Sequence, residues 1–233
     1  MIRGFYSGAT SLKAQQTAID IMSNNIANVS STGFKQKQGR FSDLLYSTVS
    51  DGTGENVSEG SGTAVIQAVN DMSSGTPQGT DSPLDFCIEG DGFFAVRDNA
   101  GNTFYTRNGS FEGAATLNGR NILTDAYGRA VLDTDGNVIG LDATGNPQGN
   151  PGVYNFPNAS ALRAYGESLY IPTQQSGAAQ RADAEVRQGY VEQSNVDLAG
   201  QMSGLLQAER AYQLNVKVVQ TADSINEMAN GLK

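Results

Sequence analysis

Residues 2–29 read IRGFYSGATSLKAQQTAIDIMSNNIANV. The large apolar side chains of this stretch recur every seven residues: Phe5, Leu12, Ile19 and Ile26. Such spacing is typical of one face of an amphipathic helix. We therefore predict a helix over residues 3–29 that buries this face against a partner. Asn and Ser residues followed by Gly33 end the pattern, because they compete for backbone hydrogen bonds and glycine readily adopts a left-handed turn.

The other end of the chain shows the same kind of pattern. Its first apolar stripe holds Leu198, Met202, Leu205, Tyr212, Val216 and Val219, and its second holds Ala211, Val218, Ala222, Ile225, Ala229 and Leu232. Ser194, with Asp197 three residues later, predicts a helix start, since the two side chains can cap free amide groups. A helix of this length would extend roughly 50 Å. The two apolar ends predict helices that pair with each other, or with copies of the same protein, in a coiled-coil-like axial domain.

The sequence between these helices is typical of short β-strands. β-branched and aromatic runs alternate with turn residues, of which Asp98–Asn102 and Asn108-Gly109 are the clearest. Tyr105 and Arg107 are predicted to lie on a surface hairpin. The fold class is α+β, with long terminal helices and a central antiparallel all-β domain. The predicted segments are an N-terminal axial helix (1–35), a connecting segment (36–83), a central β domain (84–172), a return segment (173–193) and a C-terminal axial helix (194–233).

Residues 47–62 within the connecting segment are rich in Ser, Gly, Asp and Thr. The absence of apolar anchors favours an exposed or mobile loop. An ordered strand–turn–strand is the alternative.

Charge is distributed unevenly along the chain, whose net charge is −9. Residues 1–40 carry five basic and one acidic side chain, residues 194–233 carry three basic and four acidic ones, and the middle therefore carries a net charge of −12. An acidic middle argues against nucleic-acid binding, which requires cations along the phosphate backbone. The sequence contains no run of about 20 apolar residues and no continuous apolar leader core, so we expect neither membrane insertion nor a cleaved signal peptide.

Candidate chemistry is sparse. The chain has no His, which removes the commonest general base and the commonest metal ligand. Glu89 and Asp91 flank glycines and are predicted to form a turn rather than an acid–base pair. Asp133, Asp135 and Asn137 resemble a calcium loop, but the glycine is misplaced and the bidentate Glu is missing, so we interpret this stretch as a turn. We expect no catalytic residues, no cofactor and no metal, and Cys87 is predicted to be a buried thiol.

Three motifs together resemble the bacterial flagellar axial family of rod and hook proteins. The first runs from Ile2-Arg-Gly-Phe-Tyr6 through Asn24-Asn-Ile-Ala-Asn-Val29 to Thr32-Gly-Phe-Lys35. The second is Leu84-Asp-Phe-Cys-Ile-Glu-Gly-Asp-Gly-Phe-Phe94 with Tyr105-Thr-Arg-Asn-Gly-Ser-Phe111, and the third is Gly189-Tyr-Val-Glu-Gln-Ser-Asn-Val-Asp-Leu198 leading into Ala208-Glu-Arg-Ala-Tyr-Gln-Leu-Asn215 and Val219-Gln-Thr-Ala-Asp223. The resemblance spans nearly the whole chain in the order that the family has.

This resemblance implies a structural subunit of the flagellar basal-body rod, most similar to the distal rod type. Such a subunit polymerises into a helical tube that transmits torque from motor to hook. The implied partners are copies of itself, neighbouring rod and hook proteins and the flagellar type III export apparatus. The implied axial packing residues are Phe5, Leu12, Ile19, Ile26, Leu198, Leu205, Tyr212, Val219 and Ile225. The family motif residues are Asn25, Ala27, Asn28, Gly33, Phe34, Gly92 and Phe93.

Three alternatives stay open at this point. A short hook-type protein would belong to the same family. A secreted β-rich glycoside hydrolase would need two carboxylates about 5–10 Å apart in a cleft. A calcium-binding adhesin would need the loop that the sequence lacks.

Overall fold

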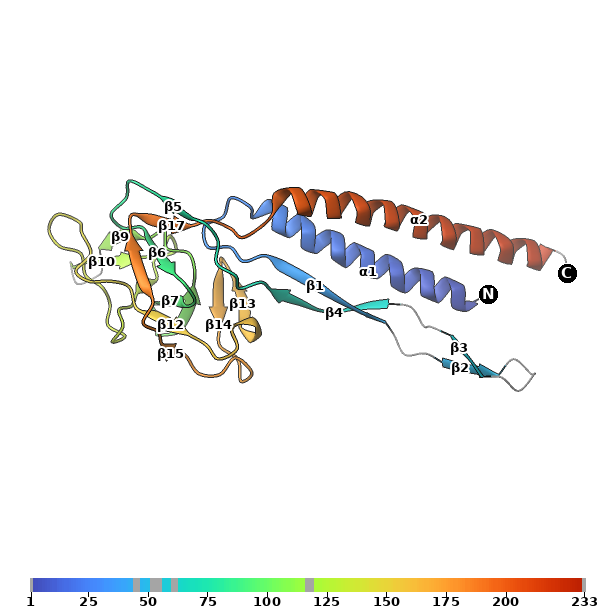
Figure 1. The fold of residues 1–233 in the computed structure, drawn as a ribbon, viewed down its shortest axis with the longest axis horizontal. Coiled ribbons are helices and arrows are strands. Elements are labelled where there is room, and N and C mark those ends of the chain that lie inside the picture. The colour runs from blue at the N-terminus through green and yellow to red at the C-terminus, as the bar shows by residue number, and fades with distance from the viewer. Residues whose placement is uncertain (1, 44–46, 51–55, 60–62, 116–119, 232–233) are drawn as a thin grey trace. The chain divides into compact units, whose positions relative to one another are not determined.

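The computed structural model describes residues 2–43, 47–50, 56–59, 63–115 and 120–231. The chain divides into two compact units, drawn in Figure 1. The helical unit comprises Met1–Ala27, Lys37–Val69 and Asp197–Lys233, and the β unit comprises Asn28–Gln36 and Asn70–Val196. This arrangement confirms an α+β chain with one helix at each end and antiparallel strands between them.

The helical unit contains two helices and four strands. Their bounds are α1 Ile2–Ala27, β1 Lys37–Asp43, β2 Ser47–Ser50, β3 Asn56–Glu59, β4 Thr63–Asn70 and α2 Leu198–Gly231. Strand β1 pairs with β4, and β2 pairs antiparallel with β3. The loop predicted over 47–62 is therefore wrong for its described residues, which form a hairpin; residues 51–55 and 60–62 lie outside the described residues. The polar side chains that favoured a loop do not prevent backbone pairing, because a ladder needs only amides and carbonyls.

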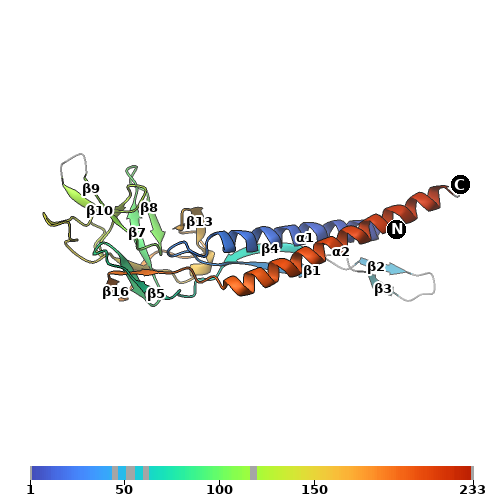
Figure 2. The ribbon, with the colours of Figure 1, turned by 90° about the horizontal axis from the view of Figure 1, so that it is seen from above.

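The two helices run antiparallel, with both termini at the same end of the pair (Figures 1 and 2). A Cβ placed on Gly8 would lie 2.8 Å from Cγ2 of Val219, and one placed on Gly204 would lie 2.9 Å from Sδ of Met22. Small residues thus let the backbones approach at both ends of the contact. Ala14, Ala18 and Ala208 are buried, although Ala18 and Ala208 only just.

The β unit contains a nine-stranded sheet and two two-stranded sheets. Its strands are β5 Pro77–Gly79, β6 Phe86–Glu89, β7 Phe93–Arg97, β8 Thr103–Thr106, β9 Glu112–Ala115, β10 Asn121–Thr124, β11 Ala130–Val131, β12 Val153–Asn155, β13 Arg163–Gly166, β14 Leu169–Ile171, β15 Gln180–Arg181, β16 Glu185–Gln188 and β17 Tyr190–Glu192. The large sheet has the order β13-β14-β8-β7-β11-β10-β9, with β12 pairing to β7 and to β15. A short 3₁₀ helix spans Ala159–Ala161.

Strand β7 lies at the centre of the β unit and is covered on both faces. Phe94 and Val96 belong to one buried cluster, whereas Phe93 and Ala95 belong to a second. Successive side chains of a strand point to opposite faces, so a run of four apolar residues fills two clusters at once. Aromatic rings pack the second cluster edge to face, with Phe93 and Phe156 centroids 5.9 Å apart.

Four turns of the β unit share one sequence pattern, an Asp followed three residues later by Gly. They are Asp98–Asn102, Asp125–Arg129, Asp133–Asn137 and Asp142–Asn146. In each, the Asp N–H donates to the carbonyl of the fifth residue at 2.9 Å, and the Gly N–H donates to the Asp carbonyl at 2.9 to 3.1 Å. The glycines have φ between 79° and 87°, the left-handed region that closes a three-residue hairpin loop. The prediction that Asp133 and Asp135 serve a turn is therefore confirmed.

The polar return segment contributes strands to this unit, which makes the unit larger than the predicted 84–172. Strand β15 pairs with β12, β16 with β6, and β17 with β5. Side chains at alternate positions, Ala182, Ala184 and Val186, pack against the core. Because these apolar residues are small and alternate with polar ones, the hydropathy signal was too weak to predict strands in the return segment.

Candidate functional site

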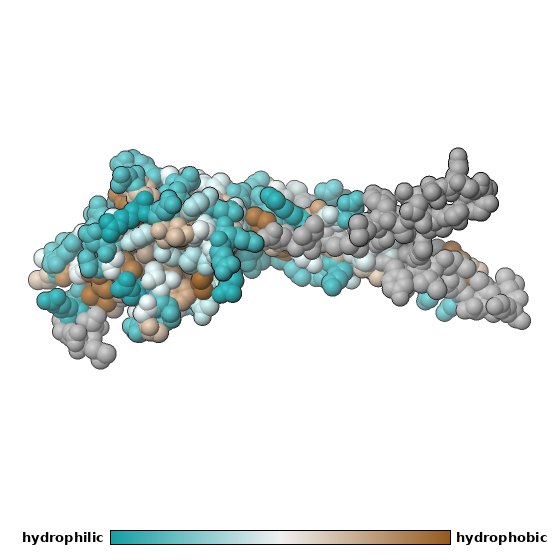
Figure 3. All heavy atoms as spheres, turned by 90° about the horizontal axis from the view of Figure 1, so that it is seen from below, coloured by the Kyte–Doolittle hydropathy of each residue, from teal (hydrophilic) through white to brown (hydrophobic). Residues whose placement is uncertain are grey.

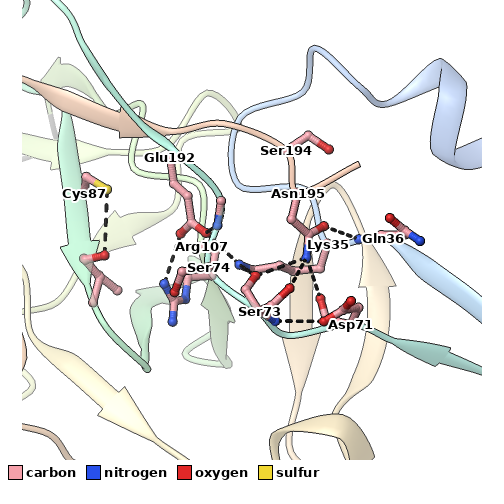
Figure 4. A network of polar contacts seen from close by, with 12 residues as sticks. Lys35, Gln36, Asp71, Ser73, Ser74, Cys87, Arg107, Glu192, Ser194 and Asn195 are labelled. Carbon is pink, nitrogen blue, oxygen red and sulfur yellow. Dashed lines mark hydrogen bonds and ion pairs between the residues drawn. The ribbon is translucent and has the colours of Figure 1, made fainter. Parts of the chain in front are cut away.

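Three charged side chains are buried together in the β unit (Figure 4). Nζ of Lys35 lies 2.6 Å from Oε1 of Glu192, and Nη1 of Arg107 lies 3.0 Å from Oε2 of the same carboxylate. All three residues are 2% exposed. We name Lys35, Arg107 and Glu192 the Glu192 cluster. It places two cations against one anion in the protein interior.

Hydrogen bonds from the surrounding backbone complete the cluster. Lys35 Nζ also donates to the carbonyl of Ser73 at 2.7 Å, and Arg107 Nη2 donates to the carbonyl of Gly90 at 2.7 Å. The Gly75 N–H donates to Oε1 of Glu192 at 2.6 Å. Burial lowers the pKa of the Lys35 ammonium below its usual range, although Glu192 opposes the shift. Glu192 is thus the single carboxylate that faces both cations in this cluster.

Each of the three sequence motifs supplies one member of the cluster. Lys35 ends the first motif, Arg107 follows β8 in the second, and Glu192 ends β17 in the third. Gly33, with φ of 66°, donates its N–H to the carbonyl of Glu192 at 2.8 Å. A Cβ on Gly33 would overlap with the backbone of Arg107, so only glycine permits this approach. The predicted left-handed turn at Gly33 is confirmed.

The chain at residues 36 and 37 is held by two asparagines. The Gln36 N–H donates to Oδ1 of Asn195 at 2.7 Å within the β unit. In the helical unit, Asn25 Oδ1 accepts from the Lys37 N–H at 2.9 Å, and its Nδ2 donates to the Lys37 carbonyl at 2.8 Å. Nδ2 of Asn25 also lies 3.1 Å from Oε1 of Gln201 on α2. One buried amide therefore joins α1 to both β1 and α2.

Replacing Asn25 with Ala is expected to lower the free energy of unfolding of the helical unit by about 2 kcal/mol. The change leaves the N–H and the carbonyl of the half-buried Lys37 without these partners. The exposed, neighbouring Ser23→Ala serves as the control and should change stability by less than about 0.5 kcal/mol. Thermal unfolding followed by helical circular dichroism measures both. Equal stability of the two variants would contradict a structural role for Asn25.

The side of α2 that faces solvent carries a second apolar surface. Its large exposed side chains recur at intervals of 3, 4, 7 or 8 residues: Leu198, Met202, Leu206, Leu214, Val218, Ile225 and Met228. At about 100° per residue this series winds gradually around the solvent-facing side of the helix, with successive members near one another along it. We name these seven residues the outer stripe. Exposed apolar stripes of this extent are typical of interaction surfaces.

The predicted axial packing residues divide between two environments. Leu12, Ile19, Ile26, Leu205, Tyr212 and Val219 are half-buried, whereas Leu198 and Ile225 are exposed on the outer stripe. The side chain of Phe5 lies outside those described. Within one chain, α1 and α2 therefore cover part of each other's apolar side.

The family motif residues lie at the end of α1, in the segment that follows it, and at the start of β7. Asn25 and Gly33 take part in the contacts given above, and Ala27 is the last residue of α1. Asn28 and Phe34 are half-buried, Gly92 is buried with φ of 143°, and Phe93 belongs to the core.

Other predicted features of the site need correction. Tyr105 and Arg107 are buried rather than on a surface hairpin, because aromatic packing and Glu192 hold them inside. The helix cap is Asp197 rather than Ser194, since Asp197 Oδ1 accepts from the Ala199 N–H at 3.1 Å. None of Lys35, Arg107 and Glu192 was predicted to be buried, although each is a charged residue inside a motif. A charged residue inside a family motif was therefore the sequence signal that could have indicated this cluster.

A cleft of about 410 Å³ lies beside the cluster in the β unit. Its lining includes Asp91, Phe93, Arg107 and Phe156, and Asp91 is the single carboxylate among the described residues that line it. Within the described ranges, no group of three or more His, Cys, Asp or Glu side chains could hold a metal ion. Cys87 is buried as predicted, and burial raises the pKa of its thiol. Neither of the two described helices is long and apolar enough to cross a membrane.

The chain thus combines paired terminal helices with an antiparallel β unit that buries a charged cluster. Comparison with known families identifies the class of protein. Residues 5–35 match the model of the flagella basal body rod protein, 87–174 the flagellar hook protein FlgE/F/G D1 domain, and 187–232 the flagellar basal body rod FlgEFG protein C-terminal region.

Full-length relatives carry the same description. The chain is 33% identical to the flagellar basal-body rod protein FlgG of Caulobacter vibrioides, over 97% of this chain and 98% of that one. It is 32% identical to FlgG of Bacillus subtilis over the whole of both chains, and 30% identical to the rod protein FlgF of Mesorhizobium japonicum over 95% and 94%. The chain therefore belongs to the family of flagellar basal-body rod proteins. The predicted resemblance to rod proteins of the distal type is confirmed, and the chain is a structural protein of the bacterial flagellum.

Proposed function

We propose that this chain polymerises with copies of itself into a helical tube that transmits torque from motor to hook. The observation that carries the proposal is the outer stripe of α2, which α1 does not cover. Packing of this stripe against a neighbouring copy would remove seven large apolar side chains from water, each worth about 1.5–3 kcal/mol when fully buried. A contact between two different faces does not close on itself and generates a helical filament.

The predicted axial residues take two roles in this proposal. The half-buried ones, such as Leu12, Ile19 and Leu205, hold α1 and α2 together in one subunit. Leu198 and Ile225 on the outer stripe contact the neighbouring subunit. Further partners are the adjoining rod and hook proteins, and delivery is by the flagellar type III export apparatus. The names of the relatives support a rod protein over a short hook-type protein.

Electron microscopy and sedimentation of the concentrated protein test the proposal. The expected result is concentration-dependent growth of rod-like particles. The β unit presents a mixed surface on the face seen in Figure 3, with hydrophobic patches separated by hydrophilic side chains. Growth should therefore depend on α2 rather than on that face. A strictly monomeric protein at all concentrations, and no rescue of motility in a strain lacking its own rod protein, would contradict the proposal.

A catalytic role is not part of the proposed function. The glycoside hydrolase alternative requires two carboxylates in one cleft. Among the described residues that line the cleft, Asp91 is the single carboxylate. Glu89, the other acid of this turn, pairs with Arg187 at 2.9 Å. The family models and relatives supply no enzyme description.

Replacing Asp91 with Asn is expected to leave motility unchanged and to alter the free energy of unfolding by less than about 1 kcal/mol, because the side chain is exposed. Swimming of a complemented strain and a glycan-hydrolysis panel on the purified protein measure the two outcomes. Hydrolysis by the parent protein that disappears with this substitution would show an enzyme.

A further inference from the structure

The segments that carry the chain between its two units come together inside the β unit. The chain passes from one unit to the other after residues 27, 36, 69 and 196. Beside three of these crossings stand Gln36, Asp71 and Asn195. The Asp71 N–H donates to the Gln36 carbonyl at 2.8 Å, Gln36 N–H to Asn195 Oδ1 at 2.7 Å, and Asn195 Nδ2 to the Asp71 carbonyl at 3.0 Å. These three bonds form a closed ring.

The Glu192 cluster anchors this ring (Figure 4). Lys35 precedes Gln36, and its ammonium bonds both Glu192 and the carbonyl of Ser73. Glu192 also accepts from the Gly75 N–H, and β17, which contains it, leads directly to Asn195. One carboxylate and its immediate neighbours therefore hold three segments of the chain: residues 33–36, 71–75 and 192–195.

Removal of the Glu192 charge would affect these segments and the core differently. Lys35 and Arg107 would become two buried cations without an anion, which strongly disfavours their burial. Few other contacts of Arg107 would offset the loss of this ion pair, because its buried Nε has no hydrogen-bond partner among the described residues. The core around Phe94, Val96 and Leu123 is held by apolar packing. Arg107 touches the second buried cluster, where its guanidinium lies 5.6 Å from the centroid of the Phe93 ring.

We propose that the Glu192 cluster is a latch: it closes after the core of the β unit has formed, and it holds the crossing segments in place without being needed for the core itself. Lys35 and Glu192 are 157 residues apart, so the latch cannot close until the chain beyond β16 is free to fold. The segment that contains Lys35 can therefore pack in place only after the segment that contains Glu192 has folded. A chain that folds progressively from its N-terminus would therefore complete its crossing segments after the strands that precede β17.

Hydrogen exchange measured by mass spectrometry on the purified full chain tests the latch. Glu192→Gln keeps the side-chain shape and removes the charge. The expected result is exchange roughly a hundredfold faster in residues 28–36, 70–76 and 189–196, with unchanged protection in β7 and β10. Lys35→Met removes the surplus cation and leaves one Arg opposite one Glu, so it should accelerate the same segments much less. Glu185→Gln, an exposed change on β16, is the control and should change nothing.

The pattern of exchange decides the outcome. Equal acceleration of the crossing segments and of β7 would make the cluster an ordinary stabilising contact and overturn the proposal. Unchanged exchange in Glu192→Gln, or a larger effect of Lys35→Met than of Glu192→Gln, would overturn it as well. The measurement is made on the unassembled chain, so its result does not depend on whether the chain polymerises as proposed above.

Discussion

Replacing Leu214 with Asp is expected to abolish incorporation of the subunit into the rod while leaving the β unit folded. Leu214 is 61% exposed and lies in the middle of the outer stripe. In the proposed tube it would be covered by a neighbouring copy, and an Asp there would lose about 2 kcal/mol of apolar burial and add several kcal/mol of desolvation. A total of about 4 kcal/mol weakens each subunit contact roughly a thousandfold.

The matched control is Gln213→Asp, which adds the same charge to the next position of α2. Gln213 is exposed but does not belong to the outer stripe. Motility of complemented strains, together with the amount of subunit recovered in purified basal bodies, measures incorporation. Thermal unfolding of both purified variants should match the parent protein. Normal incorporation of the Leu214 variant would exclude the outer stripe from the contact between subunits.

Replacing Gly109 with Ala is expected to destabilise the β unit by roughly 3 kcal/mol or more. A Cβ at this position would overlap with the carbonyl oxygen of Phe86, and the Gly109 carbonyl accepts from the Phe86 N–H at 2.9 Å. The backbone at Gly109 and strand β6 would have to separate, which breaks that bond and disturbs the buried Phe86 ring. Phe86 packs in turn on Phe111, with centroids 6.2 Å apart.

Gly140→Ala provides the comparison, because the nearest atom to its Cβ would be Oε1 of Gln148 at 3.6 Å, an ordinary contact. Its stability should lie within about 0.5 kcal/mol of the parent. Chemical denaturation of the three proteins measures the difference. Similar midpoints for both variants would show that the chain at Gly109 moves aside at little cost.

Gly109 also illustrates how a motif can be recognised for the wrong reason. The pair Asn108-Gly109 is predicted from the sequence as a tight turn, a place where glycine often supplies a left-handed conformation. Asn108 does make a local turn, since its Oδ1 accepts from the Ser110 N–H at 3.0 Å. Gly109, however, does not have a positive φ, and it is needed because another strand passes against it. Close approach of distant backbone leaves no trace in local sequence.

The return segment and the Glu192 cluster also depend on contacts between distant parts of the chain, which local sequence does not reveal. Strand β17 pairs with β5 more than a hundred residues earlier in the sequence, and neither strand has the strong apolar pattern of β7. Lys35, Arg107 and Glu192 looked like ordinary surface charges when taken one at a time. Their burial follows from partners that only the folded chain brings within hydrogen-bonding distance.

The sequence by itself determined those features that depend on neighbouring residues. The seven-residue spacing from Phe5 to Ile26 specified an amphipathic helix, and the Asp and Gly pairs of the β unit specified its turns, since helix faces and turn geometries are local properties of the backbone. The three motifs, in their order, identified the family. The tertiary structure alone decided which apolar face of α2 meets α1 and which stays exposed, and which charges are buried at Glu192. These choices depend on contacts between residues far apart in the chain, whose energies exist only after the intervening chain has folded.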